Sequence, residues 1–558
     1  MRALAYLDVL IVDCQTTGAS PAFGCVLELG WGLARANQSQ LLTAEAHWIA
    51  LPEGQRVPRQ VQKITGYEPA HAEFAVPDRE AWTRLRAAVQ RSLAAPTAIH
   101  YARFELAFLR DWSARFEPET AFPFDAVCVH AIASRLYPDL PRQSLRALAG
   151  YLGHGLDLAR RSLGHVEATA FVWRSLCAEL ATRDIVTWEQ LQAWLGERAP
   201  TKPRAPKPRY PVAPERYKTL PDAPGVYRFL RSNHDVLYVG KAASLKKRVT
   251  SHFIGRASKQ LAPEMLTQVN QIEFVLAASA LEAALLENET IKALRPPYNV
   301  QLTTSEQRVW YSKPDFGATA SAPDAEYGIG PLASPHSLRP LSALSELSAG
   351  ALPTVQLRSQ AVGVSDLWTP DEAVFAVGWA ELVARYPAEF SIAARRPRHG
   401  TLQLARRLLL SAPTKAAEDS ENPDKPEGWD PARVARHIER AVAQAYQAYR
   451  RARWLHLLHD CDIVYREPDR EQARVLLIRG GALIEARDAA LDWTPSERAR
   501  PIAAERASAR FDRADYDRMR VLSSELKRIA RDGGQVSVHF GPGSRVAERR
   551  LLSVLRLV

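Results

Sequence analysis

The sequence predicts a multidomain α/β protein whose C-terminal region is α+β. Three observations carry this prediction. The chain has 558 residues, more than one hydrophobic core normally organises. Apolar runs rich in β-branched residues alternate with segments of helical periodicity before residue 300. Two stretches rich in proline and polar residues, 196–216 and 411–429, predict linkers between the domains.

Charge and cysteine content limit the classes of function. Lys and Arg number 73 against 62 Asp and Glu, a net charge of +11 that favours a polyanionic partner. The five cysteines lack CxxC or Cys/His spacing, so we expect neither a zinc site nor a disulfide framework. The apolar start of the chain is interrupted by Asp8 and is too short to cross a bilayer. We therefore expect a cytoplasmic protein that does not bind membranes.

Residues 1–185 predict a mixed-sheet α/β domain. The runs YLDVLIVD, CVLELGWGLAR and LLTAEAHWIAL predict three strands, followed by a helix near 78–95, a short strand at 96–100 and further helices. The motif DCQTTG at 13–18, the segment HYARFE at 100–105 and the later His165 resemble the DnaQ-like exonucleases. That family, the DEDD class, has an RNase H-like fold and includes the polymerase III epsilon chain. The resemblance implies an RNase H-like domain with a two-metal exonuclease site.

The exonuclease site departs from the family pattern at three positions. The family has Glu, Asp and Asp where this sequence has Gln15, Glu105 and Ala170. Two adjacent divalent ions need several carboxylates to offset their charge. Asp13, Glu105 and His165 remain, a set suited to one weakly held ion. We therefore expect a degenerate exonuclease site, composed of Asp13, Gln15, Glu105, His165 and Ala170.

The first linker has an unusual composition. Between Arg198 and Pro214 it contains six prolines and five basic residues, and no acidic one. Such a segment is an extended, semi-rigid spacer. It either lies along DNA or is simply solvated.

Residues 217–302 predict a small α/β domain. GVYRFL and DVLYVG predict two strands of a hairpin, and QIEFVLAAS predicts a third strand. Ser244 begins one helix and the capping box at 279–282 begins another. Arg248 and Glu287 fall on the apolar stripes of these helices, where a charge is costly unless an opposite charge meets it. The two residues either pair with each other or meet a metal ion and a phosphodiester.

Six residues of this domain stand in the order and spacing of the GIY-YIG nucleases: Tyr227, Tyr238, Lys241, Arg248, Glu287 and Asn299. PGVYRFL, VLYVGKAASLKKRVTSHF and ALLENETIKALRPPYNV resemble the UvrC/Cho branch of that family, the incision endonucleases of bacterial nucleotide excision repair. The resemblance implies that these six are site residues. It also implies that Glu287 holds one divalent ion, for which an oxygen ligand suits Mg²⁺ or Mn²⁺.

The chemistry of phosphodiester hydrolysis suggests a role for each residue. The reaction needs an activated water, neutralised phosphoryl oxygens and help for the leaving oxygen. We expect Tyr238, activated by Lys241 and the metal ion, to be the base, and Tyr227 to position water or phosphate. The guanidinium fork of Arg248 suits the scissile phosphate. Asn299 is expected to orient the strand end or the substrate.

The remaining sequence gives weaker predictions. Residues 303–410 predict short helices in a Cho/UvrC-like extension of unassigned fold. The segment SIAARRPRHGTLQLARRLL contains no cysteine, so we do not expect a Cys-ligated cofactor. Within 430–558, Asp430-Pro431 begins a long helix, and a small antiparallel sheet turns at Gly480-Gly481. A further helix at 512–529 and a late strand, QVSVHF, follow.

The long helix has a basic stripe, which either contacts DNA or is simply the solvent-exposed face of the helix. Its candidate DNA-binding residues are Arg433, Arg436, Arg440 and Arg451, with Trp454 near the end as a possible stacking platform.

The sequence thus predicts a metal-dependent, structure- or damage-specific DNA endonuclease of the Cho/UvrC type, acting in nucleotide excision repair. The inactive exonuclease fold would position DNA or a partner. Expected partners are DNA and either a UvrB-like repair helicase or replication proteins. One alternative is a 3′–5′ exonuclease or proofreading subunit resembling the epsilon chain, in which Glu105 and Glu167 replace the lost ligands. The other is a noncatalytic DNA-binding scaffold, against which the intact set from Tyr227 to Asn299 argues.

Overall fold

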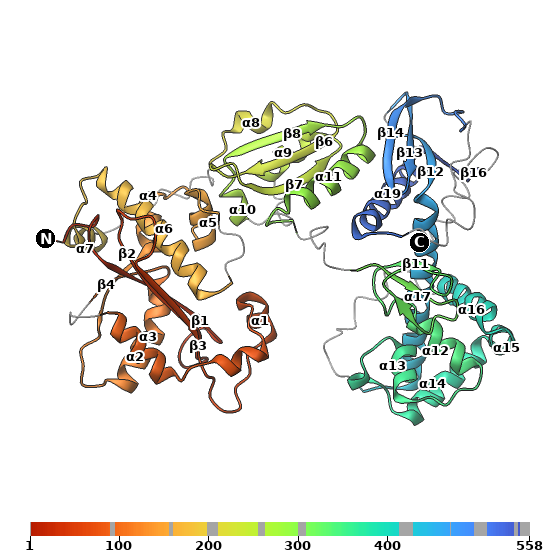
Figure 1. Cartoon of the computed structure of the whole chain (residues 1–558), viewed down its shortest axis with the longest axis horizontal. Coiled ribbons are helices and arrows are strands. Elements are labelled where there is room, and N and C mark those ends of the chain that lie inside the picture. Colours follow the sequence, from red (N-terminus) through yellow and green to blue (C-terminus); the bar gives the residue numbers. More distant parts are fainter. Residues whose placement is uncertain are drawn as a thin grey trace. The chain divides into compact units, whose positions relative to one another are not determined.

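The computed structural model describes residues 2–89, 95–155, 160–197, 210–254, 263–299, 308–411, 428–468, 470–495, 510–540 and 545–546 (Figure 1). The chain divides into two compact units. The first consists of Met1–Ala283 and Leu294–Val300, and the second of Ala284–Ala293 and Gln301–Val558. The predicted α/β multidomain class is confirmed, because the described residues form sheets with helices packed against them in both units.

The N-terminal domain is built on a mixed five-stranded sheet in the order β3-β2-β1-β4-β5. Its strands are β1 (Val9–Thr16), β2 (Val26–Ala34), β3 (Thr43–Trp48), β4 (Ala95–Ile99) and β5 (Phe124–Cys128). β1 pairs antiparallel with β2 and parallel with β4, β2 pairs antiparallel with β3, and β4 pairs parallel with β5. This order and these directions are those of the RNase H-like fold, as the sequence predicted.

Helices cover both faces of this sheet because its central strand is apolar on both sides. The helices are α1 (Arg59–Thr65), α2 (Asp78–Ala88), α3 (Ala102–Phe116), α4 (Val129–Leu136), α5 (Leu145–Tyr151), α6 (Ser162–Ala181) and α7 (Trp188–Gly196), with a 3₁₀ turn η1 (Pro69–Phe74). Val9 and Ile11 of β1 pack in the core that contains Trp173 of α6, whereas Leu10 and Val12 pack in the core that contains Trp82 of α2. The first of these cores also includes Trp188 and Leu191, so it extends past the predicted boundary at 185.

The second domain has a three-stranded antiparallel sheet in the order β7-β6-β8. Its elements are α8 (Pro214–Lys218), β6 (Gly225–Leu230), β7 (Val236–Ala242), α9 (Leu245–Ile254), α10 (Pro263–Leu266), β8 (Gln271–Leu276) and α11 (Ala280–Leu294). The predicted hairpin, third strand and helices are therefore confirmed. The core includes Val212, inside the predicted linker 196–216, of which 198–209 lies outside the described residues.

The second unit begins with a small sheet and a group of helices around one long helix. The sheet, β10-β9-β11, consists of β9 (Trp310–Ser312), β10 (Thr319–Ala320) and β11 (Ile329–Leu332). The helices are α12 (Arg339–Ser348), α13 (Val355–Val362), α14 (Glu372–Arg385), α15 (Pro387–Arg395), α16 (Pro397–Ser411) and α17 (Pro431–Leu458), with a 3₁₀ turn η2 (Asp366–Trp368). One core joins α17 to the helices before it, so the predicted segments 303–410 and 430–558 are not separate cores. The predicted linker 411–429 lies largely outside the described residues, which omit 412–427.

The C-terminal part is α+β, as predicted. Five antiparallel strands stand in the order β14-β13-β12-β15-β16. They are β12 (Cys461–Arg466), β13 (Ala473–Arg479), β14 (Ala482–Ala489), β15 (Gln535–His539) and β16 (Arg545–Val546), accompanied by the helix α19 (Arg513–Arg531). Gly480 and Gly481 have φ angles of 56° and 75°, which is why glycine occupies the β13–β14 turn. The Asp430 carboxylate accepts a hydrogen bond from the Arg433 N–H at 2.8 Å, so the predicted N-cap of α17 is confirmed.

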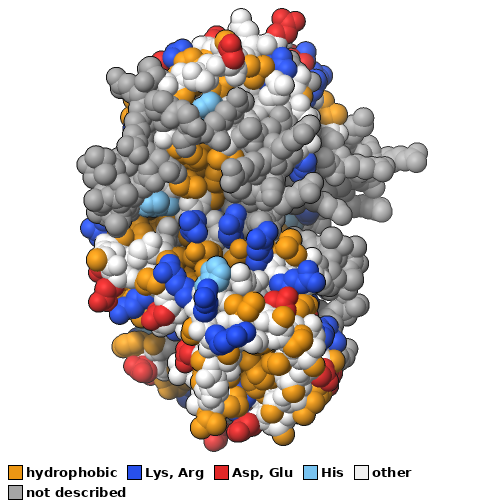
Figure 2. Space-filling view, turned by 90° about the vertical axis from the view of Figure 1, so that its right-hand side faces the viewer, with side chains coloured by type: hydrophobic (Ala, Val, Ile, Leu, Met, Phe, Trp, Pro, Cys, Tyr) orange, Lys and Arg blue, Asp and Glu red, His pale blue; other side chains and the backbone are white. Residues whose placement is uncertain are grey.

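Helix hydropathy and surface charge complete the description. None of the helices in the described ranges is long and apolar enough to cross a membrane. On the face shown in Figure 2, Lys and Arg side chains gather around a histidine.

Candidate nuclease sites

The β6–β7 hairpin brings two predicted site tyrosines together. Tyr227 on β6 is fully buried, and its ring centroid lies 6.2 Å from that of Tyr238 on β7. Tyr227 stands opposite Gly240 in the register. A Cβ at Gly240 would lie 2.6 Å from the Tyr227 hydroxyl, so only glycine allows this close approach. The local sequence Tyr-Val-Gly thus shapes the space around the phenol.

A histidine that the sequence analysis gave no role completes this cluster. The Tyr227 hydroxyl lies 2.7 Å from Nε2 of His252, which is buried on α9. Burial, with a smaller contribution from Arg248, lowers the pKa of His252 to about 4. The ring is therefore neutral near pH 7, so it joins the phenol through a hydrogen bond rather than an ion pair. The signal in the sequence was a histidine on the apolar stripe of the helix.

The orientation predicted for Arg248 is wrong. Leu245, Val249 and His252 are buried along α9, but Arg248 is exposed. The apolar stripe is narrower than the predicted spacing assumed, and the position three residues after Leu245 falls at its solvent edge. Arg248 therefore needs no buried partner, and its guanidinium is accessible to a phosphate from solvent. Its role in phosphate binding stays a prediction.

Asn299 ties the loop after α11 to β7. Its side-chain oxygen accepts a hydrogen bond from the Val239 N–H, and its amide nitrogen donates to the Val239 carbonyl, both at 2.9 Å. Val239 directly follows Tyr238, so this pair of bonds fixes the strand that carries the tyrosine. The neighbouring Tyr298 hydroxyl donates to Glu264 at 3.0 Å, and burial raises the pKa of Tyr298 to about 12.

The remaining predicted residues, Lys241 and Glu287, are both half-buried. Lys241 lies on β7, and Glu287 lies on α11 in the segment Ala284–Ala293 that groups with the second unit. A single carboxylate suits Mg²⁺, which binds through one or two carboxylates and keeps several waters. The donor chemistry therefore fits the implied ion, and the roles of Lys241 and Glu287 stay predictions.

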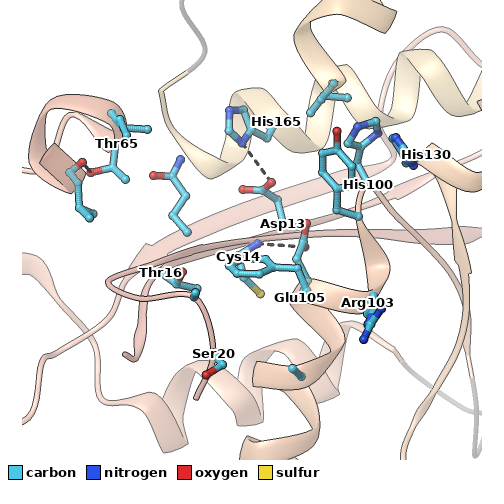
Figure 3. A pocket seen from close by; sticks show the side chains of 18 of the residues that line it. Asp13, Cys14, Thr16, Ser20, Thr65, His100, Arg103, Glu105, His130 and His165 are labelled. Carbon is cyan, nitrogen blue, oxygen red and sulfur yellow. Dashed lines mark hydrogen bonds and ion pairs between the residues drawn. The ribbon is translucent and has the colours of Figure 1, made fainter. Parts of the chain in front are cut away.

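A cavity of about 1290 Å³ opens in the N-terminal domain at the predicted exonuclease site (Figure 3). Asp13, Gln15, Glu105 and His165 all line it. Asp13 Oδ1 lies 3.1 Å from Nδ1 of His165, and the Cys14 N–H donates to the Glu105 carboxylate at 3.1 Å. β1, α3 and α6 thus bring four of the five predicted residues of this site together.

The charged groups of the cavity act on one another. Burial, and then the charge of Asp13, raise the pKa of Glu105 well above its usual range. Gln15 donates to the Arg160 carbonyl through Nε2, while Gln15 Oε1 and Asp13 Oδ2 are buried without a hydrogen-bond partner among the described residues. Nowhere in the described ranges do three His, Cys, Asp or Glu side chains form a group that could hold a metal ion. Two adjacent carboxylates and an amide do not fit the two-ion chemistry of the DEDD class.

The fifth residue, Ala170, is not at the cavity but in the apolar core of α6, with Val166 and Trp173. Glu167, one turn earlier, is exposed and does not line the cavity. The replacement of the lost ligand by Glu167, which the exonuclease alternative requires, is therefore not seen.

The basic stripe of α17 is only partly available to a ligand. Arg436, Arg440 and Arg451 are exposed, but Arg433 is half-buried, with its guanidinium 5.3 Å from the Trp429 ring. The proposed stacking role of Trp454 is wrong, because its ring is buried and its N–H donates to the Ser523 hydroxyl at 3.0 Å. α17 packs against helices on several sides, including α19, which carries Ser523, and this packing explains why Trp454 is buried.

Known proteins resemble parts of this chain. The model of the UvrC-like GIY-YIG domain matches residues 223–300, a range that contains all six predicted site residues. The UvrABC system protein C of Rhizobium etli is 51% identical over 85 residues, which cover 15% of this chain and 12% of that protein. A candidate bifunctional exonuclease/endonuclease protein of Mycobacterium tuberculosis is 30% identical over 202 residues, covering 36% of this chain and 30% of that protein. The magnesium-bound GIY-YIG N-terminal endonuclease domain of UvrC from Thermotoga maritima is 29% identical, with a TM-score of 0.14, covering 15% of this chain and 93% of that domain.

Together, the fold and the site define a two-part nuclease-type chain. Its first part is an exonuclease-like domain with an RNase H-like sheet, and its second is a GIY-YIG domain of the UvrC type. The chain thus joins the two predicted modules. The matches cover only 12–18% of the length of the UvrABC system protein C relatives.

Proposed function

We propose that this protein is a metal-dependent DNA endonuclease that nicks one strand of damaged or structured DNA in nucleotide excision repair. The observation that carries the proposal is the Tyr227–His252 hydrogen bond, inside a domain that retains all six residues of the GIY-YIG set. Relatives named UvrABC system protein C, and a related UvrC domain bound to magnesium, support the reaction and the ion.

Side chains of the second domain supply the steps around the scissile phosphate. Neutral His252 holds the Tyr227 hydroxyl in place through their hydrogen bond, so that the phenol positions the attacking water or the phosphate. Tyr238, beside it on β7, is the second phenol that orients or deprotonates the attacking water. The exposed Arg248 binds the phosphate from solvent with its guanidinium fork.

The other residues hold this arrangement in place. Asn299 fixes the strand of Tyr238 through Val239, and Lys241 adds positive charge near the phenols. Glu287 holds the Mg²⁺ or Mn²⁺ ion. When bound, that ion neutralises charge on the phosphoryl oxygens.

The N-terminal domain positions DNA or a partner rather than cutting. Its cavity keeps Asp13 and Glu105 but not the carboxylates that two ions require. DNA is the expected ligand of the chain, and a UvrB-like repair helicase or replication proteins are its proposed protein partners.

The test is cleavage of end-labelled bubble and lesion-bearing duplexes by the full chain. We expect discrete internal nicks with Mg²⁺ or Mn²⁺, none with a chelator, and a loss of at least about 10³-fold in Glu287→Ala. Glu289→Ala is the matched control, because Glu289 is an exposed glutamate on the same helix. Nicking by Glu287→Ala at the wild-type rate would refute the metal assignment.

A further inference from the structure

We propose that the outer surface of α15 and α16 binds the phosphate backbone of duplex DNA, as a site separate from the nuclease residues. The identification of the polyanion as DNA rests on the proposed function, whereas the binding surface itself rests on the charges and packing of these two helices. The surface is defined by Arg395, Arg396, Arg398, Arg406 and Arg407, all of which are exposed.

The charge of this segment is concentrated and of one sign. Residues 387–411 contain five arginines, one glutamate, and neither lysine nor aspartate, so they carry +4 of the chain's net charge of +11. In Figure 1, α15 and α16 lie on the side that Figure 2 turns toward the viewer, and there Figure 2 shows Lys and Arg gathered around a histidine. A local positive field of this kind attracts and steers a polyanion.

These arginines have few acidic neighbours. No acidic side chain in the described ranges pairs with Arg396, Arg398 or Arg406, and the Arg407–Glu389 pair is long, at 3.9 Å. Elsewhere in the same unit, exposed arginines form closer pairs, such as Arg385–Glu439 at 2.8 Å and Arg531–Asp532 at 3.1 Å. Like charges held together without counterions repel one another, and phosphates would relieve that repulsion.

Close packing of α15 against α16 fixes the two helices that carry the arginines. A Cβ at Gly400 would overlap the backbone of Ala393, so α15 and α16 meet in close backbone contact. Their inner faces bury Phe390, Leu404 and Leu408 in the core of the unit. The arginines therefore project from ordered helices, and their guanidinium forks match phosphate oxygens better than lysines would.

The composition of this surface favours the duplex backbone over single-stranded bases. Phe390 is the single Phe, Tyr or Trp between 387 and 411, and it is buried. Single-strand binders use exposed aromatic rings on which bases stack. Without such rings, the contact is electrostatic, independent of sequence and sensitive to salt.

The test measures how binding of a fluorescent 30-base-pair duplex depends on salt, in chelator and in the Glu287→Ala background so that DNA is not cut. Neutralising Arg396, Arg398 and Arg406 together by glutamine should reduce the slope of log K against log salt by about 2.7, because each phosphate contact contributes about 0.9. The affinity at low salt should fall by at least about tenfold. Arg520, Lys527 and Arg531 on α19 provide the matched control, since glutamine at these exposed positions removes the same charge.

The outcomes separate this inference from the proposed nuclease. The inference would be overturned if the variant with glutamine at Arg396, Arg398 and Arg406 kept the wild-type salt slope, affinity and circular dichroism spectrum. An equal loss of slope and affinity in the α19 control would also overturn it. Tighter binding of a matched RNA duplex would overturn the choice of DNA. If the expected slope change occurs but the wild-type chain does not nick DNA, the surface stands and the proposed function fails.

Discussion

The cavity of the N-terminal domain and the tyrosine cluster of the second domain place their reactive groups in different surroundings. In the cavity, Asp13 and Glu105 lie close together, and burial holds the pKa of Glu105 well above its usual range. In the cluster, the Tyr227 hydroxyl bonds to His252, whose pKa is lowered to about 4. One site holds two neighbouring buried carboxylates, while the other pairs a phenol with a neutral imidazole.

This difference teaches that a fold can be kept while the residues at its site change. The sheet and both cores of the N-terminal domain are complete. Yet Gln15 donates its amide N–H to the Arg160 carbonyl, a bond that a carboxylate at this position could not make. Ala170 likewise fills an apolar core, where an unpaired aspartate would be costly. Gln15 and Ala170 therefore suit their present surroundings, which agrees with the degenerate site that the sequence predicts.

After Glu287→Ala, the largest effect on the comparison is expected from Tyr227→Phe. This change removes the hydroxyl that bonds to His252 and should lower the single-turnover nicking rate by about 10²-fold or more. Tyr210→Phe, another tyrosine packed in this domain, is the control and should keep the rate. An unchanged rate in Tyr227→Phe would remove the phenol–imidazole pair from the mechanism.

Asn299→Ala should have the next largest effect. It leaves the N–H and C=O groups of Val239 without the side chain that bonds both, which should destabilise the second domain by about 1–3 kcal/mol. Hydrogen exchange at Val239 reports the local loss, and nicking should fall about tenfold because the strand of Tyr238 is released. Normal protection at Val239 in the variant would show that other contacts hold the strand.

The stability of the N-terminal domain should depend on pH, in a way that distinguishes it from the second domain. Burial, and then His130, lower the pKa of His100 to about 3, whereas an unfolded histidine has a pKa near 6.5. Below about pH 6.5 the unfolded state binds a proton that the folded state excludes. Stability should therefore fall as pH drops from about 6.5 toward 3, by up to about 1.4 kcal/mol per pH unit from this group.

Hydrogen exchange of β1 and β4 peptides across this pH range measures the slope. His100→Asn removes the titrating group and should flatten it. The same slope in the variant would assign the pH dependence to other groups.

The sequence predicted the folds of the first two domains well because their patterns are local. A continuous apolar run specified β1, and the hairpin, the caps and the position of Gly240 specified the second domain. The orientation of Arg248 was missed because helical spacing alone does not determine how wide the buried stripe is. The Tyr227–His252 bond was missed because it joins a strand to a helix 25 residues away.

The second unit was predicted less well for a similar reason. Burial of Trp454 and the sharing of one core between α17 and the preceding helices depend on long-range packing. Periodicity found α17 and its N-cap, but it could not tell a helix with one wet face from a helix packed on several sides.

The most direct test of the central claim compares the products of Glu287→Ala and Asp13→Ala with those of the wild type. Each full chain is incubated with end-labelled bubble duplex and Mg²⁺, and the product lengths are read on a sequencing gel. If the GIY-YIG domain is the active nuclease, discrete internal cuts are lost in Glu287→Ala and retained in Asp13→Ala. A ladder of shortened 3′ ends that disappears only in Asp13→Ala would contradict this account and make the N-terminal cavity the active site.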